Sequence, residues 1–133
     1  MDCHELAMLY EVESKKTIEE IDQALKEAAA RHKFGVLGVH DLKETMKNKG
    51  VEFAKQVRVY EVCNPFKAKA VLEANGAVST VLPCRISVYE SGAGFKIATL
   101  LPTALMSLFG SEELKPVAEE VEATLKAMME ESA

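Results

Sequence analysis

Cys63 stands at the junction between an apolar run and a helix start, in the stretch Tyr60–Pro65, YEVCNP. Asn64 is a favourable N-cap, and Pro65 suits the first helical position because its missing N–H would have no partner there. A helix N-terminus carries partial positive charge, which can lower the pKa of an adjacent thiol and also suits a bound anion. The sequence therefore predicts thiol chemistry or anion binding at Cys63.

His40 occupies the matching place one unit earlier, just before Asp41, an acidic N-cap with Glu44 three residues on. If the two strands are parallel neighbours, His40 and Cys63 end on the same edge of the sheet, where open α/β sheets bind ligands. A nearby histidine could activate the thiol or share a metal with it. Glu61 shares a strand face with Cys63. The candidate ligand-binding residues are His40, Asp41, Glu61, Cys63 and Asn64.

The other cysteines are expected to play a different part. Cys84 begins a strand after a predicted helical crossover, which would place it at the opposite end of the sheet from Cys63. A disulfide between them is therefore not expected unless the loop at residues 75–83 folds back. The odd number of cysteines and the absence of an export signal predict free thiols in a reducing compartment, the cytoplasm. The alternative for Cys63 and Cys84 is simple packing, since a buried free cysteine behaves as a small hydrophobe.

Each of the three tyrosines follows an aliphatic residue and precedes a glutamate, at Tyr10, Tyr60 and Tyr89. Because side chains alternate across a strand, the tyrosines would share one sheet face if the preceding aliphatic residues pack against helices. Arg58 would join them. That face is predicted to be covered by a second subunit or to line a ligand cavity, although tyrosines are also simply good strand formers.

Hydrophobic periodicity and capping signals indicate the elements that must position these residues. They predict one α+β domain spanning residues 1–133, with a mixed five-stranded sheet and helices packed mainly on one face. The expected order is β-α-β-α-β-α-β-β-α, with an additional short helix before the last long one. The expected strands are 6–12, 34–40, 55–63, 84–89 and 95–101. The first expected helix is capped by Ser14 or Thr17 and runs to about residue 33, and the others are 41–49, 64–75, 102–109 and one that starts at 111.

The composition narrows the class of function. The chain has 133 residues, of which 48% are hydrophobic and 28% charged, with a formal net charge of -5. Such an acidic chain is not expected to bind nucleic acid, which needs a basic face. No apolar run approaches the roughly 20 residues of a membrane helix. The sequence also lacks C-x-x-C, G-x-S-x-G, G-x-G-x-x-G, P-loop and H-E-x-x-H motifs.

Four segments resemble the domain-of-unknown-function 302 family: GVHDLKETMKNKG, YEVCNPFKAKAVL, LPCRISVYE and LLPTALMSLF. The resemblance covers nearly the whole chain and includes Cys63, Asn64, Pro65, Pro83, Cys84 and Arg85 at family-like positions. It implies a small α+β domain whose relatives tend to be dimers. It carries over no catalytic residues, and some family contexts hint at redox or sulfur metabolism.

Together these observations favour a cytoplasmic, homodimeric binding module that holds a small ligand, anion or metal near Cys63 and His40. One alternative is a thiol-dependent enzyme or a sulfur or redox carrier, with Cys63 as nucleophile and His40 as base. Another is a protein-interaction module that uses the tyrosine-lined face. No cofactor and no metal ligand set is assigned, and the sequence leaves open whether the protein is an enzyme.

Overall fold

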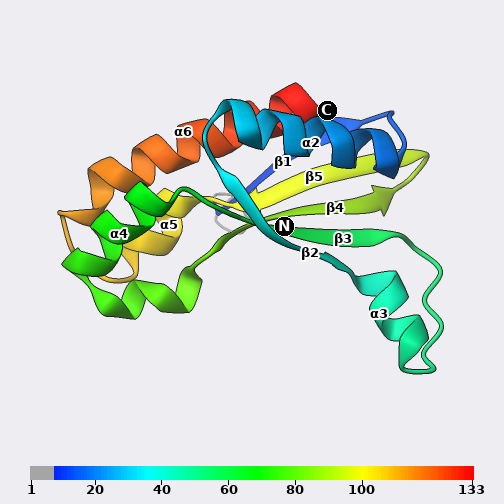
Figure 1. The fold of residues 1–133 in the computed structure, drawn as a ribbon, viewed down its shortest axis with the longest axis horizontal. Coiled ribbons are helices and arrows are strands. Elements are labelled where there is room, and N and C mark those ends of the chain that lie inside the picture. The colour runs from blue at the N-terminus through cyan, green and yellow to red at the C-terminus, as the bar shows by residue number, and fades with distance from the viewer. Residues whose placement is uncertain (1–7) are drawn as a thin grey trace.

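A computed structural model describes residues 8–133, which form one five-stranded sheet and its helices (Figure 1). The strands are β1 (Leu9–Ser14), β2 (Gly35–Asp41), β3 (Val57–Cys63), β4 (Cys84–Ser91) and β5 (Gly94–Leu100). The helices are α2 (Ile18–Arg31), α3 (Leu42–Asn48), α4 (Pro65–Ala74), α5 (Pro102–Ser107) and α6 (Leu114–Ser132), with the 3-10 helix η1 (Gly76–Val81) before β4. The predicted α+β class and the order of elements are confirmed. Cys3, one of the predicted free thiols, lies outside the described residues.

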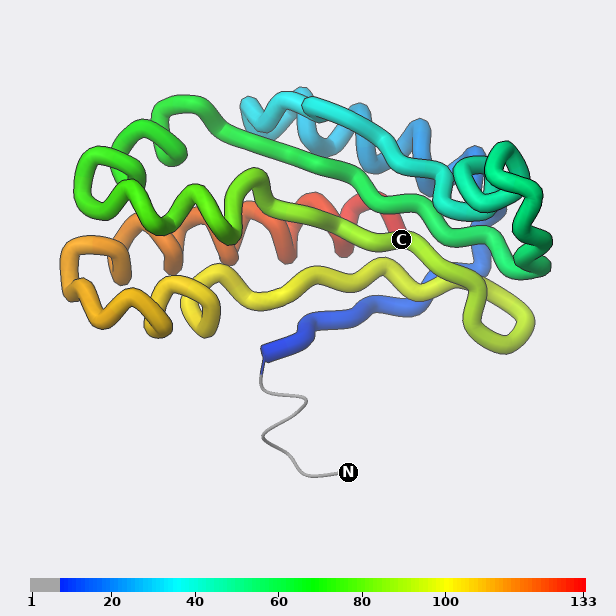
Figure 2. Tube along the Cα trace, turned by 90° about the horizontal axis from the view of Figure 1, so that it is seen from below, coloured from blue at the N-terminus to red at the C-terminus, as the bar shows by residue number. Residues whose placement is uncertain are grey.

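The sheet has the strand order β1-β5-β4-β3-β2, and every neighbouring pair is antiparallel. The predicted mixed sheet is therefore wrong in its strand directions. The cause lies in the connections that were expected to cross back over the sheet. At about 1.5 Å per residue, α3 is roughly 10 Å long, too short to return the chain along a strand. It leaves the end of the sheet instead, so the chain reverses into the adjacent strand β3 (Figure 2).

Helices α2 and α6 run antiparallel to each other and cover one face of the sheet (Figure 1). Thr17 caps α2 through a capping box with Glu20, which satisfies two backbone N–H groups at its start. Apolar residues at helical spacing then turn one side of α2 to the sheet. These buried residues are Ile18, Ile21, Leu25, Ala28 and Ala29.

The core consists of two clusters. The larger cluster lies between the sheet and the two covering helices, and it contains Tyr60, Ile86, Val88 and Ile97 from the strands. The smaller cluster lies beyond one end of the sheet, where α4, η1, α5 and the start of α6 meet; it is formed by Val71, Val78, Met106, Leu114 and Ala118. The connection from β3 to β4 thus packs against α5 and α6 and does not cross the sheet.

Two features of this fold leave apolar surface uncovered. The face of the sheet opposite α2 and α6 carries no helix across it, and we call it the open face (Figures 1 and 2). Residues 42–56, which comprise α3 and the segment leading to β3, project from one end of the sheet, and we call them the arm (Figure 1). Helix α3 has no buried residue. No helix within residues 8–133 is long and apolar enough to cross a membrane.

Candidate functional site

The main hollow of the open face is a groove of about 530 Å³ above strands β4, β5 and β1. η1 and the segment after it border one side, and α5 borders another. The walls are largely apolar and include Leu9, Val81, Leu100, Leu105 and Met106. Polar groups come from Arg85, Ser87 and Tyr89, which alternate along β4 with the buried Ile86 and Val88. The groove therefore combines a broad apolar surface with a few polar side chains on one strand, as small-molecule sites usually do.

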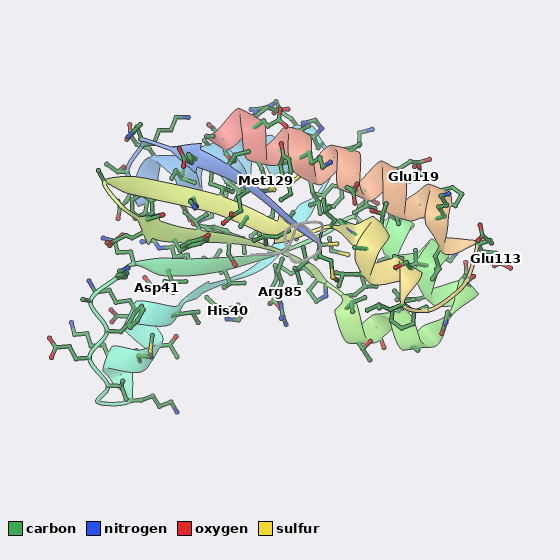
Figure 3. All side chains as sticks on the ribbon, turned by 180° about the vertical axis from the view of Figure 1, so that it is seen from behind. His40, Asp41, Arg85, Glu113, Glu119 and Met129 are labelled. Atoms are coloured by element: carbon green, nitrogen blue, oxygen red, sulfur yellow. The ribbon has the colours of Figure 1, made fainter. Side chains whose placement is uncertain are left out.

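A polar row lies beside the groove on the same face. His40 Nε2 is 3.0 Å from Glu61 Oε1, and Arg85 Nε is 4.0 Å from Glu61 Oε2. Figure 3 shows His40 and Arg85 on the side of the sheet away from Met129 of α6. Glu61 thus lies between a histidine and an arginine contributed by the two neighbouring strands.

A β-bulge makes room for this row. The register between β2 and β3 shifts between Val36 and Gly38, so that Gly38 lies opposite Glu61. A Cβ on Gly38 would lie 3.2 Å from Glu61 Oε1 and 3.8 Å from His40 Nε2. The glycine therefore leaves space for the carboxylate to approach His40. Bulges of this kind are frequent beside functional sites.

Tyr89 forms the second polar contact of the open face. Its hydroxyl donates a hydrogen bond to Glu11 of β1. This hydrogen bond, together with burial and the nearby charge of Glu11, raises the pKa of Tyr89 to about 12. Tyr89 therefore stays neutral at physiological pH and serves as a hydrogen-bonding group at the groove.

The structure separates His40 from Cys63, which the sequence had placed together. Because β2 and β3 are antiparallel, His40 lies opposite Val59, whereas Cys63 lies opposite Gly35 at the other end of the pair. His40 and Cys63 are therefore four residues apart along the strand direction, a distance of about 13 Å. The predicted pairing of His40 with Cys63 is therefore wrong. His40 contacts Glu61 instead.

Asp41 and Asn64 act as helix caps, as their positions predicted. Asp41 Oδ1 accepts a hydrogen bond from the backbone N–H of Glu44 at 3.0 Å. Asn64 Oδ1 accepts from the N–H groups of Phe66 and Lys67 at 3.0 and 3.2 Å. These contacts use the side-chain oxygens to begin α3 and α4, which is a structural role.

Cys63 and Cys84 lie at the same end of the sheet, contrary to the prediction. Cys84 pairs with Val62, the residue before Cys63, because β3 and β4 are antiparallel. Both cysteines are free and line a small apolar cavity of about 30 Å³ under α4 and α6. Burial raises the pKa of Cys63, and burial together with the charge of Cys63 raises that of Cys84 to about 11. The thiolate that α4 was expected to favour is thus disfavoured by desolvation.

The raised pKa of Cys63 predicts slow alkylation at neutral pH. In a Cys3→Ser/Cys84→Ser background, we expect the rate of iodoacetamide alkylation to keep rising above pH 9, because only the thiolate reacts. His40→Ala should leave this profile unchanged, since His40 is far from the thiol. An apparent pKa below about 8.5 that rises in His40→Ala would contradict this and restore a Cys–His pair.

Two of the three tyrosines point to the covered face, so the predicted tyrosine-lined face is wrong. Tyr60 is fully buried in the larger core cluster, and Tyr10 packs against that cluster and donates a hydrogen bond to Glu130 of α6. Arg58 also lies on this side, with its guanidinium 3.6 to 3.8 Å from the carboxylates of Glu19, Asp22 and Asp41. Only Tyr89 lies on the open face. The tyrosine rings fit the covered side because each hydroxyl reaches a carboxylate at the helix layer.

Arg85 and the apolar walls are the parts of the site that were not predicted. The signal was present in β4, where Arg85, Ser87 and Tyr89 alternate with aliphatic residues. Such alternation is typical of an antiparallel strand with one covered and one open face. Among residues 8–133, no three His, Cys, Asp or Glu side chains gather closely enough to hold a metal ion.

These features define a class: an α+β protein with an antiparallel sheet, helices on one face, and a mainly apolar groove on the other. The chain belongs to the family described as the domain of unknown function DUF302, whose model matches residues 10–132. It is similar to an uncharacterized conserved DUF302 protein from Bacillus stearothermophilus, known from a crystal structure, with 31% identity and a TM-score of 0.90. That match covers 95% of this chain and 98% of the other. No curated protein matches the chain significantly.

Proposed function

We propose that this protein is a non-catalytic binding module that holds a small, largely apolar molecule in the groove of the open face. The observation that carries the proposal is the groove itself. Its volume of about 530 Å³ falls within the roughly 300–1,000 Å³ of typical small-molecule sites. Its apolar walls would desolvate the body of a ligand, and the polar side chains of β4 would orient it.

Three further observations support binding without catalysis. Both described thiols have raised pKa values, which disfavours a cysteine nucleophile. His40 lies about 13 Å along the strand from Cys63. The groove residues are held by strands of an antiparallel sheet, which suits a preformed binding surface.

The free thiols Cys63 and Cys84 fit a protein of the reducing cytoplasm.

A neutral fluorophore tests the groove. We expect 1-pyrenebutanol to bind with micromolar affinity, measured by fluorescence anisotropy. Leu100→Asp should weaken this binding about tenfold or more, because Leu100 lines the groove and a carboxylate there would face the ligand's apolar body. Leu100 is 49% exposed, so the folded protein tolerates the change.

Leu37→Asp is the matched control for this experiment. Leu37 is 64% exposed on the edge strand β2 and does not line the groove. Its replacement should leave the affinity for 1-pyrenebutanol unchanged. Absence of binding to the unmodified protein, or equal loss of affinity in both variants, would overturn the proposal.

We propose in addition that two copies associate, with the arm of each contacting the other. The arm is favoured as the contact between the two copies because α3 buries no side chain, and a helix of seven residues is not stable in water without packing. Leu42, Val51 and Phe53 are exposed on the arm. The arm is also basic, with four lysines against two glutamates, whereas the whole chain is acidic. A second copy therefore offers both apolar surface and complementary charge, and sedimentation equilibrium would detect it.

A further inference from the structure

Arg85 lies where the groove meets the polar row. It belongs to β4, lines the groove, and its side chain is 68% exposed. The strand beneath it is held firmly, because the hydroxyl of the buried Thr99 donates a hydrogen bond to the Arg85 carbonyl oxygen at 2.7 Å. Figure 3 shows the side chain on the uncovered side of the sheet. A ligand in the groove would therefore meet a positively charged side chain that projects from a firmly held strand.

Arg85 has less contact with carboxylates than either of the other two arginines. Arg31 donates to Glu131 at 2.7 Å, and Arg58 lies among three carboxylates. Within residues 8–133, the only carboxylate within 4.0 Å of the Arg85 guanidinium is Glu61, at that distance from Nε. Glu61 makes its closer contact with His40, at 3.0 Å.

The guanidinium of arginine is a planar fork of N–H donors that fits a carboxylate with two parallel hydrogen bonds. In Arg85 the described contact involves Nε, so the terminal nitrogens point to no partner among residues 8–133. The groove beside it is apolar at Leu9, Leu100 and Leu105. A ligand that pairs with the Arg85 guanidinium and also packs against the apolar wall has an apolar body and one acidic group at its end.

We infer that the groove selects small amphipathic carboxylic acids, with Arg85 binding the carboxylate and the apolar walls binding the rest. This inference rests on the proposed function and names the chemical class of its ligand. The hydroxyls of Ser87 and Thr80, which also line the groove, supply further donors. Arg85 acts as a binding residue that sets the preference for an acid over a neutral molecule of the same shape.

The test compares two probes with the same apolar body, 1-pyrenebutanoate and 1-pyrenebutanol, by fluorescence anisotropy at pH 7.5. We expect the acid to bind about tenfold more tightly than the alcohol, the effect of one charge-assisted contact. Arg85→Gln should abolish this preference, because it lowers the affinity for the acid far more than the affinity for the alcohol. Arg85→Lys should keep part of it, since lysine retains the charge without the fork.

Arg31→Gln is the control, because Arg31 pairs with Glu131 outside the groove. It should bind both probes as the unmodified protein does. This inference is overturned if the alcohol binds but the acid binds no more tightly, or if Arg85→Gln keeps the preference for the acid. In either case the groove would still be a binding site for apolar molecules. If the alcohol does not bind the unmodified protein, the proposed function fails as well.

Discussion

Replacing Tyr60 with alanine is expected to lower the free energy of unfolding by about 3–5 kcal/mol, the range for removing a large aromatic side chain from a core. Tyr60 is fully buried on β3 and belongs to the larger core cluster beneath the covering helices. Its removal leaves a cavity that the surrounding sheet and helices can fill only in part. Urea denaturation followed by circular dichroism measures the effect.

The hydroxyl of Tyr60 can be tested separately. It donates a hydrogen bond of 2.5 Å to Asp22 Oδ1 of α2, and burial together with this bond raises the pKa of Tyr60. Tyr60→Phe keeps the ring and should cost only about 1 kcal/mol. Asp22 would still have Lys26, whose Nζ is 3.0 Å from its carboxylate.

The control for these two variants is Leu37→Ala. Leu37 is exposed, so this substitution should change the free energy of unfolding by no more than about 0.5 kcal/mol. A loss below about 1 kcal/mol in Tyr60→Ala would contradict the burial of the ring. A loss in Tyr60→Phe as large as in Tyr60→Ala would show that the hydroxyl contact dominates.

Phe53→Asp is expected to convert the proposed dimer to a monomer. Phe53 is exposed on the arm, within the segment that leads into β3. Truncating an aromatic interface residue at a hot spot costs about 2 kcal/mol or more, and a symmetric dimer makes the contact twice. The dissociation constant should therefore rise roughly a thousandfold, at about 1.4 kcal/mol per factor of ten. Sedimentation equilibrium at micromolar concentrations measures the change.

Phe66→Asp provides the matched control for the dimer. Phe66 is 82% exposed on α4, at the other end of the sheet from the arm. The same substitution there should leave the association unchanged. A monomer before any substitution, or a dimer that both variants weaken equally, would refute association through the arm.

The local signals in the sequence predicted the elements well. Asn64 and Pro65 begin α4, Asp41 caps α3 and Thr17 caps α2, because each of these contacts spans only a few residues. The helical spacing of the buried residues in α2 likewise indicated the face that packs on the sheet. Such signals are strong because the interacting groups are fixed by helix geometry alone.

The tyrosines show where local reasoning failed. Tyr60 and Tyr89 have the same neighbours, Val on one side and Glu on the other, yet Tyr60 faces the helices and Tyr89 faces the groove. The tripeptide cannot decide the face, because a one-residue change of register turns every side chain to the opposite side. In β3 the decision comes from Val62, which is buried with Tyr60, and in β4 from Ile86 and Val88.

By itself the sequence determined the α+β class, the order of the elements, their caps and the apolar faces of the long helices. Only the tertiary structure decided that all five strands are antiparallel. That choice brings His40 to Glu61 and Cys63 to the end where Cys84 begins its strand, and it aligns Arg85 with the groove. The physical reason is that strand direction depends on where the connections pack. Helix α3 is too short to return along the sheet, and α4 with η1 packs beneath α5 and α6, so each chain reversal leads into a neighbouring antiparallel strand.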